Sequence, residues 1–98
     1  MFLAKVIGHV VATQKNPRME GRKLLFLMPY ITKDGRQVPS GSSIVAVDTL
    51  GAGEGEFVMF TQGSSARMTD ETRDLPIDAV VIGIVDSVEV QGRKTELP

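Results

Sequence analysis

Two short stretches of this 98-residue chain carry residue types that could do chemistry, and the first is a glycine-rich run at 51–55. Backbone N–H groups in such a run can approach a phosphate closely. The run lacks the lysine and the Ser/Thr of a P-loop, and Glu54 with Glu56 would repel an anion. We therefore interpret it as a tight connection between strands that uses positive φ at glycine, Gly53 included.

The second stretch is the pentapeptide at 63–67, where a serine could act as a nucleophile. Ser64 or Ser65 would need a base within hydrogen-bond reach, and the single histidine, His9, lies in an apolar run typical of a strand. We therefore predict no catalytic residue and no enzyme activity. Small residues at this point suit close packing, and Arg67 could pair with a carboxylate either within the chain or across a subunit contact.

Two charged groups allow binding hypotheses. Asp70, Glu71 and Asp74 could hold a divalent cation, but they alternate with arginines as on a solvated face, and we predict no metal and no cofactor. The basic group at 15–23 could contact single-stranded nucleic acid if the fold were an OB-like barrel. Five aromatic residues and a formal net charge of −1 give this alternative little support.

Composition limits the class of protein. A domain of 98 residues buries only about 60–65% of the surface of its unfolded chain, so association is a natural source of stability. There is no cysteine for a disulfide or a thiolate metal site. The first apolar run is interrupted by Lys5 and His9, and no stretch approaches the ~18 apolar residues of a membrane span. We expect a cytoplasmic protein with no membrane partner.

The pattern of apolar residues and turns predicts an all-β fold, with strands at 2–13, 23–31, 43–48, 56–62 and 77–90. Asp34 and Gly35 predict a hairpin, and Pro39 with Gly41 an irregular segment. Ser64 or Ser65 could cap a short helix or 3₁₀ turn that extends toward Arg73. Five strands predict a small closed or nearly closed β-barrel in a single domain over 1–98, with 91–98 as a candidate flexible tail.

The first and last predicted strands carry apolar side chains on both faces. In the last one, Val80, Ile82 and Ile84 alternate with Ala79, Val81 and Val85. A sheet this small has no helical layer to cover its second face. That face must therefore be covered by a loop, by the short helix or by another subunit, which favours an oligomer.

These motifs occur along nearly the whole chain in the order found in a known family. The segments are 3–8, 13–17, 21–25, 51–56, 63–67 and 77–86. In this order the chain resembles the EutN/CcmL family of bacterial microcompartment and carboxysome vertex proteins.

The resemblance implies an OB-like barrel that assembles as a cyclic pentamer and closes the five-fold vertices of a polyhedral shell in the cytoplasm. Its implied partners are hexameric and trimeric shell proteins, with no nucleic acid bound. It places one set of residues near subunit contacts: Gly51, Gly53, Gly63, Ser64, Ser65, Ala66 and Arg67. It places a second set at the rim that faces the rest of the shell: Lys15, Asn16, Pro17, Arg18 and Arg22.

Overall fold

The computed structural model describes residues 1–13, 15–73 and 75–98. Gln14 of the predicted 13–17 turn and Asp74 of the predicted acidic group lie outside the described residues. The strands are β1 (Phe2–His9), β2 (Lys23–Lys33), β3 (Arg36–Pro39), β4 (Ile44–Asp48), β5 (Phe57–Gln62), β6 (Ala79–Val85), β7 (Glu89–Val90) and β8 (Arg93–Lys94). Two 3₁₀ helices accompany them, η1 (Pro17–Met19) and η2 (Gly63–Arg67).

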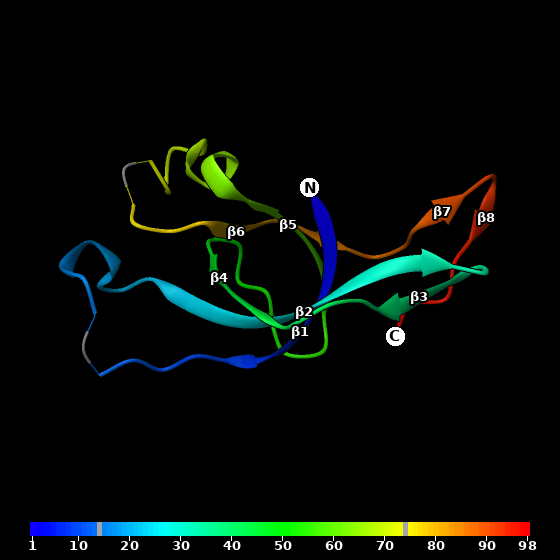
Figure 1. Cartoon of the computed structure of the whole chain (residues 1–98), viewed down its shortest axis with the longest axis horizontal. Coiled ribbons are helices and arrows are strands. Elements are labelled where there is room, and N and C mark those ends of the chain that lie inside the picture. Colours follow the sequence, from blue (N-terminus) through cyan, green and yellow to red (C-terminus); the bar gives the residue numbers. More distant parts are fainter. Residues whose placement is uncertain (14, 74) are drawn as a thin grey trace.

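Five of the strands close into a barrel, as the sequence predicts. Neighbours follow the order β1-β5-β6-β4-β2, and β2 pairs with β1 to complete the circle. Every pair in the circle is antiparallel except β4 with β6, which is parallel. In Figure 1, β1 runs down from the N-terminus past β6 toward β2. The all-β class and the closed five-stranded barrel are therefore confirmed.

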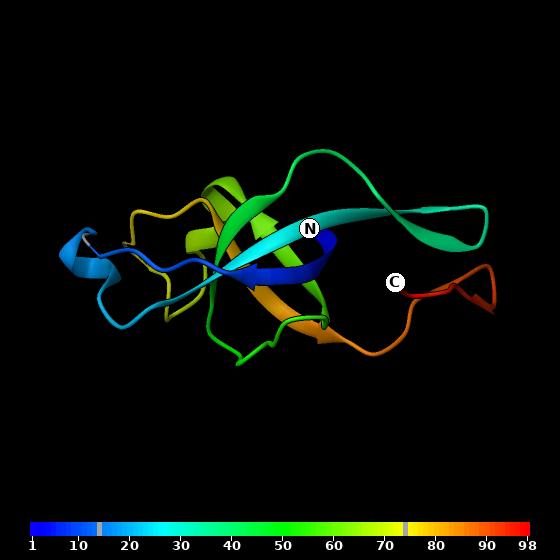
Figure 2. The ribbon, with the colours of Figure 1, turned by 90° about the horizontal axis from the view of Figure 1, so that it is seen from below.

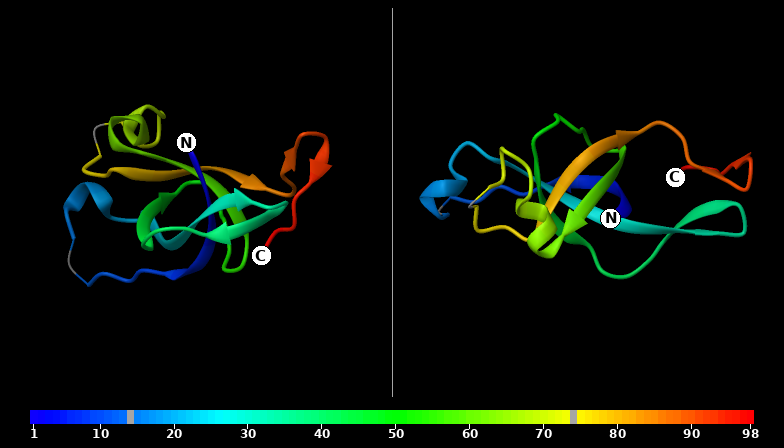
Figure 3. Two further views of the ribbon diagram at one scale, coloured as in Figure 1. Left: turned by 45° about the vertical axis from the view of Figure 1, so that its right-hand side comes forward. Right: turned by 90° about the horizontal axis from the view of Figure 1, so that it is seen from above.

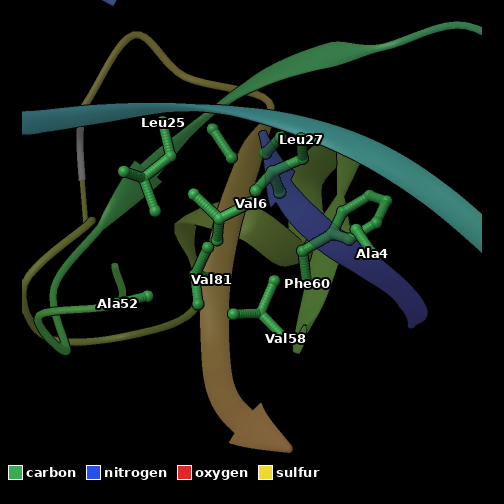
Figure 4. Packing of buried hydrophobic residues seen from close by; sticks show 10 residues of the cluster. Ala4, Val6, Leu25, Leu27, Ala52, Val58, Phe60 and Val81 are labelled. Carbon is green, nitrogen blue, oxygen red and sulfur yellow. The ribbon is translucent and has the colours of Figure 1, made fainter. Parts of the chain in front are cut away.

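The barrel interior is filled by aliphatic side chains and one phenylalanine. Alternate residues of each strand point inward, because successive side chains of a strand face opposite sides of the sheet. The cluster consists of Ala4, Val6, Leu25, Leu27, Ala46, Ala52, Val58, Phe60, Ala79 and Val81 (Figure 4). At about 25 cal/mol per Å² of apolar surface, burying each of the large side chains contributes about 1.5–3 kcal/mol.

A second, smaller cluster lies on the outer face of β4 and β6. Val47 and Val80 have the opposite parity to the core residues, and they are covered by Ala66 of η2 and Met19 of η1. On β6 this confirms in part the prediction that a loop or the short helix covers the second apolar face: Val80 is covered, whereas Ile84 on the same face is 40% exposed. On β1 the outer face stays open, since Ile7 is exposed.

Several predicted boundaries are wrong. The predicted strand at 2–13 ends at His9, and the one at 77–90 divides into β6 and β7 around Asp86 and Ser87. The predicted serine N-cap is also wrong: η2 begins at Gly63, and Gln62 occupies the cap position without a side-chain bond. The reason is that the Gly63 N–H donates to the Asp78 carbonyl, so the approaching chain satisfies the helix start.

An arm extends the barrel along its long axis. β2 continues beyond the barrel and turns into β3 through Asp34 (φ 53°) and Gly35 (φ 76°), which confirms the predicted hairpin. The small β7–β8 hairpin lies beside this arm, and the loop between β1 and β2 lies at the other end of the molecule (Figures 2 and 3). The molecule therefore measures 44 × 24 × 22 Å.

The C-terminal residues make definite contacts with the arm. Thr95 is buried, and its hydroxyl accepts a bond from the Gln37 side chain (3.1 Å). The Gln37 N–H also donates to the Glu96 carbonyl (3.0 Å). Flexibility of 91–98 stays a prediction, and these contacts connect part of the segment to β3.

Candidate subunit-contact site

The glycine-rich connection between β4 and β5 is organised by a buried aspartate that the sequence interpretation did not single out. Asp48, the last residue of β4, has a fully buried side chain. Its two carboxylate oxygens accept the N–H groups of Leu50 (3.0 Å) and Ala52 (2.8 Å). Lys23 Nζ lies 3.6 Å from Asp48 Oδ2 and donates to the Ala52 carbonyl (2.8 Å). Because its partners are in place, the buried charge is compensated.

The rest of the turn is held from the barrel and from its own side chains. Glu56 Oε1 accepts the Gly53 N–H (2.6 Å), and the Gly55 N–H donates to the Val6 carbonyl of β1 (2.8 Å). Four N–H groups of the turn that could cradle a phosphate, those of Leu50, Ala52, Gly53 and Gly55, thus bond within the chain. The turn is a tight strand connection, as predicted, and its geometry gives no support to nucleotide binding.

The prediction of a positive φ at Gly53 is wrong. The glycines of this turn with positive φ are Gly51 (84°) and Gly55 (91°). A Cβ atom at Gly53 would instead lie 3.3 Å from Glu56 Oε1, the flexible end of a side chain. The left-handed backbone is therefore needed on either side of Gly53, where the chain reverses, while Gly53 itself presents its N–H to Glu56.

The second predicted group forms η2. Gly63 has a φ of 67°, Ser64 and Ser65 are exposed, and Ala66 is fully buried against the outer face of β4 and β6. Arg67 was expected to pair with a carboxylate within the chain or across a contact. In the chain, Arg67 Nη1 donates to the backbone carbonyl of Ile77 (2.8 Å). This bond connects η2 to the segment that leads into β6.

The two predicted groups lie at different ends of β6 within one chain. The glycine-rich turn leads into Phe57, which pairs with Val85, and η2 follows Gln62, which pairs with Ala79. At about 3.3 Å per residue, the ends of β6 are about 20 Å apart. The structure therefore does not bring Gly53 and η2 together in a single subunit.

The predicted rim residues lie in the excursion between β1 and β2. Asn16 caps η1, because its side-chain oxygen accepts the Arg18 N–H (2.9 Å). Met19 is buried in the outer cluster and fixes the excursion on the barrel. Of the other predicted rim residues, Pro17 and Arg18 are exposed, and Lys15 and Arg22 are half-buried. Lys23, which sequence reasoning grouped with them, belongs to the Asp48 site instead.

The residues considered for catalysis are not arranged as a catalytic pair. His9 ends β1 opposite Leu25 of β2, whereas Ser65 lies on η2, which packs on β5 and β6. In the acidic group, Asp70 pairs with Arg73 (3.0 Å) on the surface. No metal-binding group of three or more His, Asp or Glu residues is found in the part of the chain that the structure describes. Those described residues also form no helix that is long and apolar enough to span a membrane.

The outer face of β2 and β4 is where the nucleic-acid alternative can be assessed. OB-like barrels bind oligonucleotides on the face of their second and third strands, which here are β2 and β4. That face presents Phe26 and Val45, both exposed, and Lys23 at its end is engaged with Asp48. A cationic track along the backbone of a nucleic acid is what such binding needs. The structure therefore does not favour this alternative.

A signal for the Asp48 site was available in the sequence. An Asp directly before a glycine-containing turn is a common residue for capping that turn with its side chain. Lys23 had no such signal, because its partners Asp48 and Ala52 are more than twenty residues away along the chain.

Comparison with known proteins identifies the relatives of this chain. The family model described as "Ethanolamine utilisation protein EutN/carboxysome" matches residues 1–86. The bacterial microcompartment shell vertex protein GrpN of Rhodospirillum rubrum is 49% identical over 89 residues, which cover 91% of this chain and 97% of GrpN. The carboxysome shell vertex protein CcmL of Gloeobacter violaceus is 44% identical over 93 residues, 95% of this chain and 90% of that protein.

Solved structures agree with the sequence matches. The structure of GrpN, a pentameric microcompartment shell protein from Rhodospirillum rubrum, superposes with a TM-score of 0.77 and 48% identity, covering 92% of this chain and 98% of that one. The barrel and the segments attached to it are therefore shared over almost the full length.

Proposed function

The chain belongs to the EutN/CcmL family, and we propose that it is a structural shell protein that assembles as a cyclic pentamer and occupies the five-fold vertices of a bacterial microcompartment. The observation that carries the proposal is the match to GrpN, a pentameric shell protein whose whole fold corresponds to this chain. The role is mechanical: pentagons introduced into a flat hexagonal layer give the curvature that closes a shell.

A ring of five requires two different contact surfaces on each subunit. Only a head-to-tail contact, in which one patch docks against another patch of the next copy, closes an odd-numbered ring. The glycine-rich turn and η2, at different ends of β6, offer two separate surfaces of this kind. With typical contacts of about 800 Å² on each side, a ring would cover about a quarter of the 6158 Å² surface of one subunit.

The residues proposed for subunit contacts divide into two roles. Ser64, Ser65 and Arg67 present side chains outward, and Gly51 and Gly53 present backbone. Ala66 and Gly63 act from beneath: Ala66 lets η2 lie close to the barrel, and the Gly63 N–H fixes its start on Asp78. In this proposal η2 is a small, rigid ridge, and Arg67 keeps guanidinium donors for a neighbour besides the one used on Ile77.

The proposed partners beyond the ring are hexameric and trimeric shell proteins. The excursion at 15–22 supports the assignment of a rim, because η1 is fixed by Met19 while Pro17 and Arg18 are exposed at one end of the long axis. In this proposal the protein lies in the shell, inside the cytoplasm, and contributes no active site of its own.

Co-assembly tests this function. We would express a hexameric shell protein with and without this chain and examine the particles by electron microscopy. The proposal predicts closed polyhedra in the presence of the chain, and sheets, tubes or particles with open corners in its absence. Identical particles in both preparations would contradict it.

A further inference from the structure

The outer face of β2 and β4 exposes apolar side chains that the barrel does not use. Phe26 of β2 and Val45 of β4 stand directly opposite each other in the antiparallel register. Their sequence neighbours Leu25, Leu27 and Ala46 point into the core, so Phe26 and Val45 point outward. They are 36% and 43% exposed. The apolar pair therefore lies on a sheet face and not at an open edge.

A groove of about 240 Å³ continues this apolar surface. Its lining includes Met19, Leu24, Val45, Val47, Pro76 and Ile77. Among the described residues that line it, Asp78 is the one with an ionisable side chain. A surface of this composition has no cation for a phosphate and few polar groups to orient a small metabolite, so it fits the apolar side chains of a protein.

We propose that this surface, the β2–β4 face, formed by Leu24, Phe26, Val45, Pro76 and Ile77, binds a second copy of this chain as one of the two contact surfaces of the ring. The inference rests on the proposed function, since it specifies the surface that a neighbouring subunit covers. A small domain gains much of its stability from association, and an apolar pair left in water contributes none.

The β2–β4 face is continuous with the elements proposed to lie at subunit contacts. Ile77 in the wall of the groove accepts the Arg67 bond, and Asp78 beside it accepts the Gly63 N–H, so the wall and η2 form one structural unit. Met19, on the other side, belongs to the excursion that carries the proposed rim. A neighbour seated in the groove would thus touch η2 and lie next to the rim, as a contact near the shell layer requires.

The chain's lack of cysteine allows a direct test, because one introduced thiol is unique. Val45→Cys changes the side-chain volume little. Val90→Cys is a matched control, since Val90 is 42% exposed and lies on β7, in the hairpin beside the arm and away from the face. The measurement is the rate of maleimide labelling of each variant, with its mass determined by light scattering in the same buffer.

In a protein of five-subunit mass we expect the thiol at position 45 to label at least about tenfold more slowly than the thiol at position 90, because labelling requires local opening of the contact. Equal rates at the two positions, both fast or both slow, in a protein of that mass would overturn the assignment. A one-subunit mass for both variants and for the unmodified chain would overturn the proposed function itself.

A charge substitution gives a second, independent readout. Val45→Lys places an ammonium in the proposed contact and should shift the mass from five subunits toward one, while Val90→Lys should keep five. Circular dichroism confirms that each variant keeps its β-sheet. A folded Val45→Lys protein that retains five subunits would also overturn the assignment.

Discussion

The inner and outer faces of the barrel strands differ in how far the chain itself buries their apolar side chains. Inside the barrel, Leu25, Leu27 and Phe60 are almost completely buried by their own chain. Outside, the cluster around Val47 and Val80 is covered by two 3₁₀ turns and then gives way to the exposed pair Phe26 and Val45. Apolar residues on neighbouring strands can therefore either stabilise the subunit or be left available for a partner. Inward-facing residues are buried by the barrel itself, whereas an outward-facing residue such as Val47 is buried because η1 and η2 cover it, and Val45 on the same face stays exposed.

The sharpest test of this comparison uses two phenylalanines. Phe60→Ala should lower the free energy of unfolding by about 3–5 kcal/mol, because it leaves a cavity in a packed core. Phe26→Ala should cost about 1 kcal/mol in the isolated subunit, since its ring is already partly in solvent. Urea denaturation of both variants at one dilute protein concentration provides the measurement. Equal losses would break the distinction between the two faces.

The Asp48 site predicts the next largest effect. Asp48→Ala removes the acceptor for two backbone N–H groups and the partner of Lys23, so the subunit should lose about 2–3 kcal/mol. Lys23 is 40% exposed, and most of that loss therefore comes from the two N–H groups.

Asp48→Asn is the control for charge, because its amide keeps one acceptor oxygen at the start of the turn. It should lose about half as much as Asp48→Ala, measured in the same denaturant series. If both variants unfold like the unmodified protein, the carboxylate does not organise the turn.

Two glycines of the glycine-rich turn differ in their backbone conformation and should differ in their tolerance of a side chain. Gly51→Ala should cost about 1–2 kcal/mol, because its φ of 84° is strained for any residue with a Cβ. Gly53→Ala should cost less than about 0.5 kcal/mol, since its backbone is not left-handed and the Glu56 side chain can give way. Thermal unfolding followed by circular dichroism compares the two. The reverse order of melting temperatures would contradict the described turn.

A small effect on the stability of the subunit is also expected for a change at Arg67. Arg67→Glu removes one exposed hydrogen bond to Ile77 and should change the free energy of unfolding by less than about 1 kcal/mol. Its effect on assembly should be larger, because the reversed charge lies on the proposed contact ridge. Arg73→Glu, which disturbs the surface pair with Asp70, is the control. Sedimentation velocity of both variants would reject the proposed contact if their oligomer distributions coincide.

The sequence predicts the fold class well because that information is local. Alternation of apolar residues, the Asp34–Gly35 hairpin and the glycine-rich turn each depend on neighbours within a few positions. The arm was harder to foresee: β3 is a short strand of four residues, half of which carry polar side chains, and it is fixed by β2 and by Glu96 of the C-terminal segment. Periodicity alone cannot reveal a partner sixty residues away.

The candidate site was predictable only in outline. The family motifs indicated η2 and the glycine-rich turn. The buried Asp48 carboxylate that shapes the turn meets Lys23 through the register of β2 with β4, which the sequence does not reveal. The Phe26–Val45 pair has the same origin. In sequence, both residues look like ordinary strand positions, and the register places them opposite each other on the outside of the barrel.

The assembly of five subunits can be tested by the solution mass of the unmodified protein, measured by light scattering coupled to size exclusion at two concentrations. A cyclic pentamer has about five times the 10.6 kDa subunit mass, and we expect this mass at both concentrations. A stable mass of one subunit at both concentrations would contradict it.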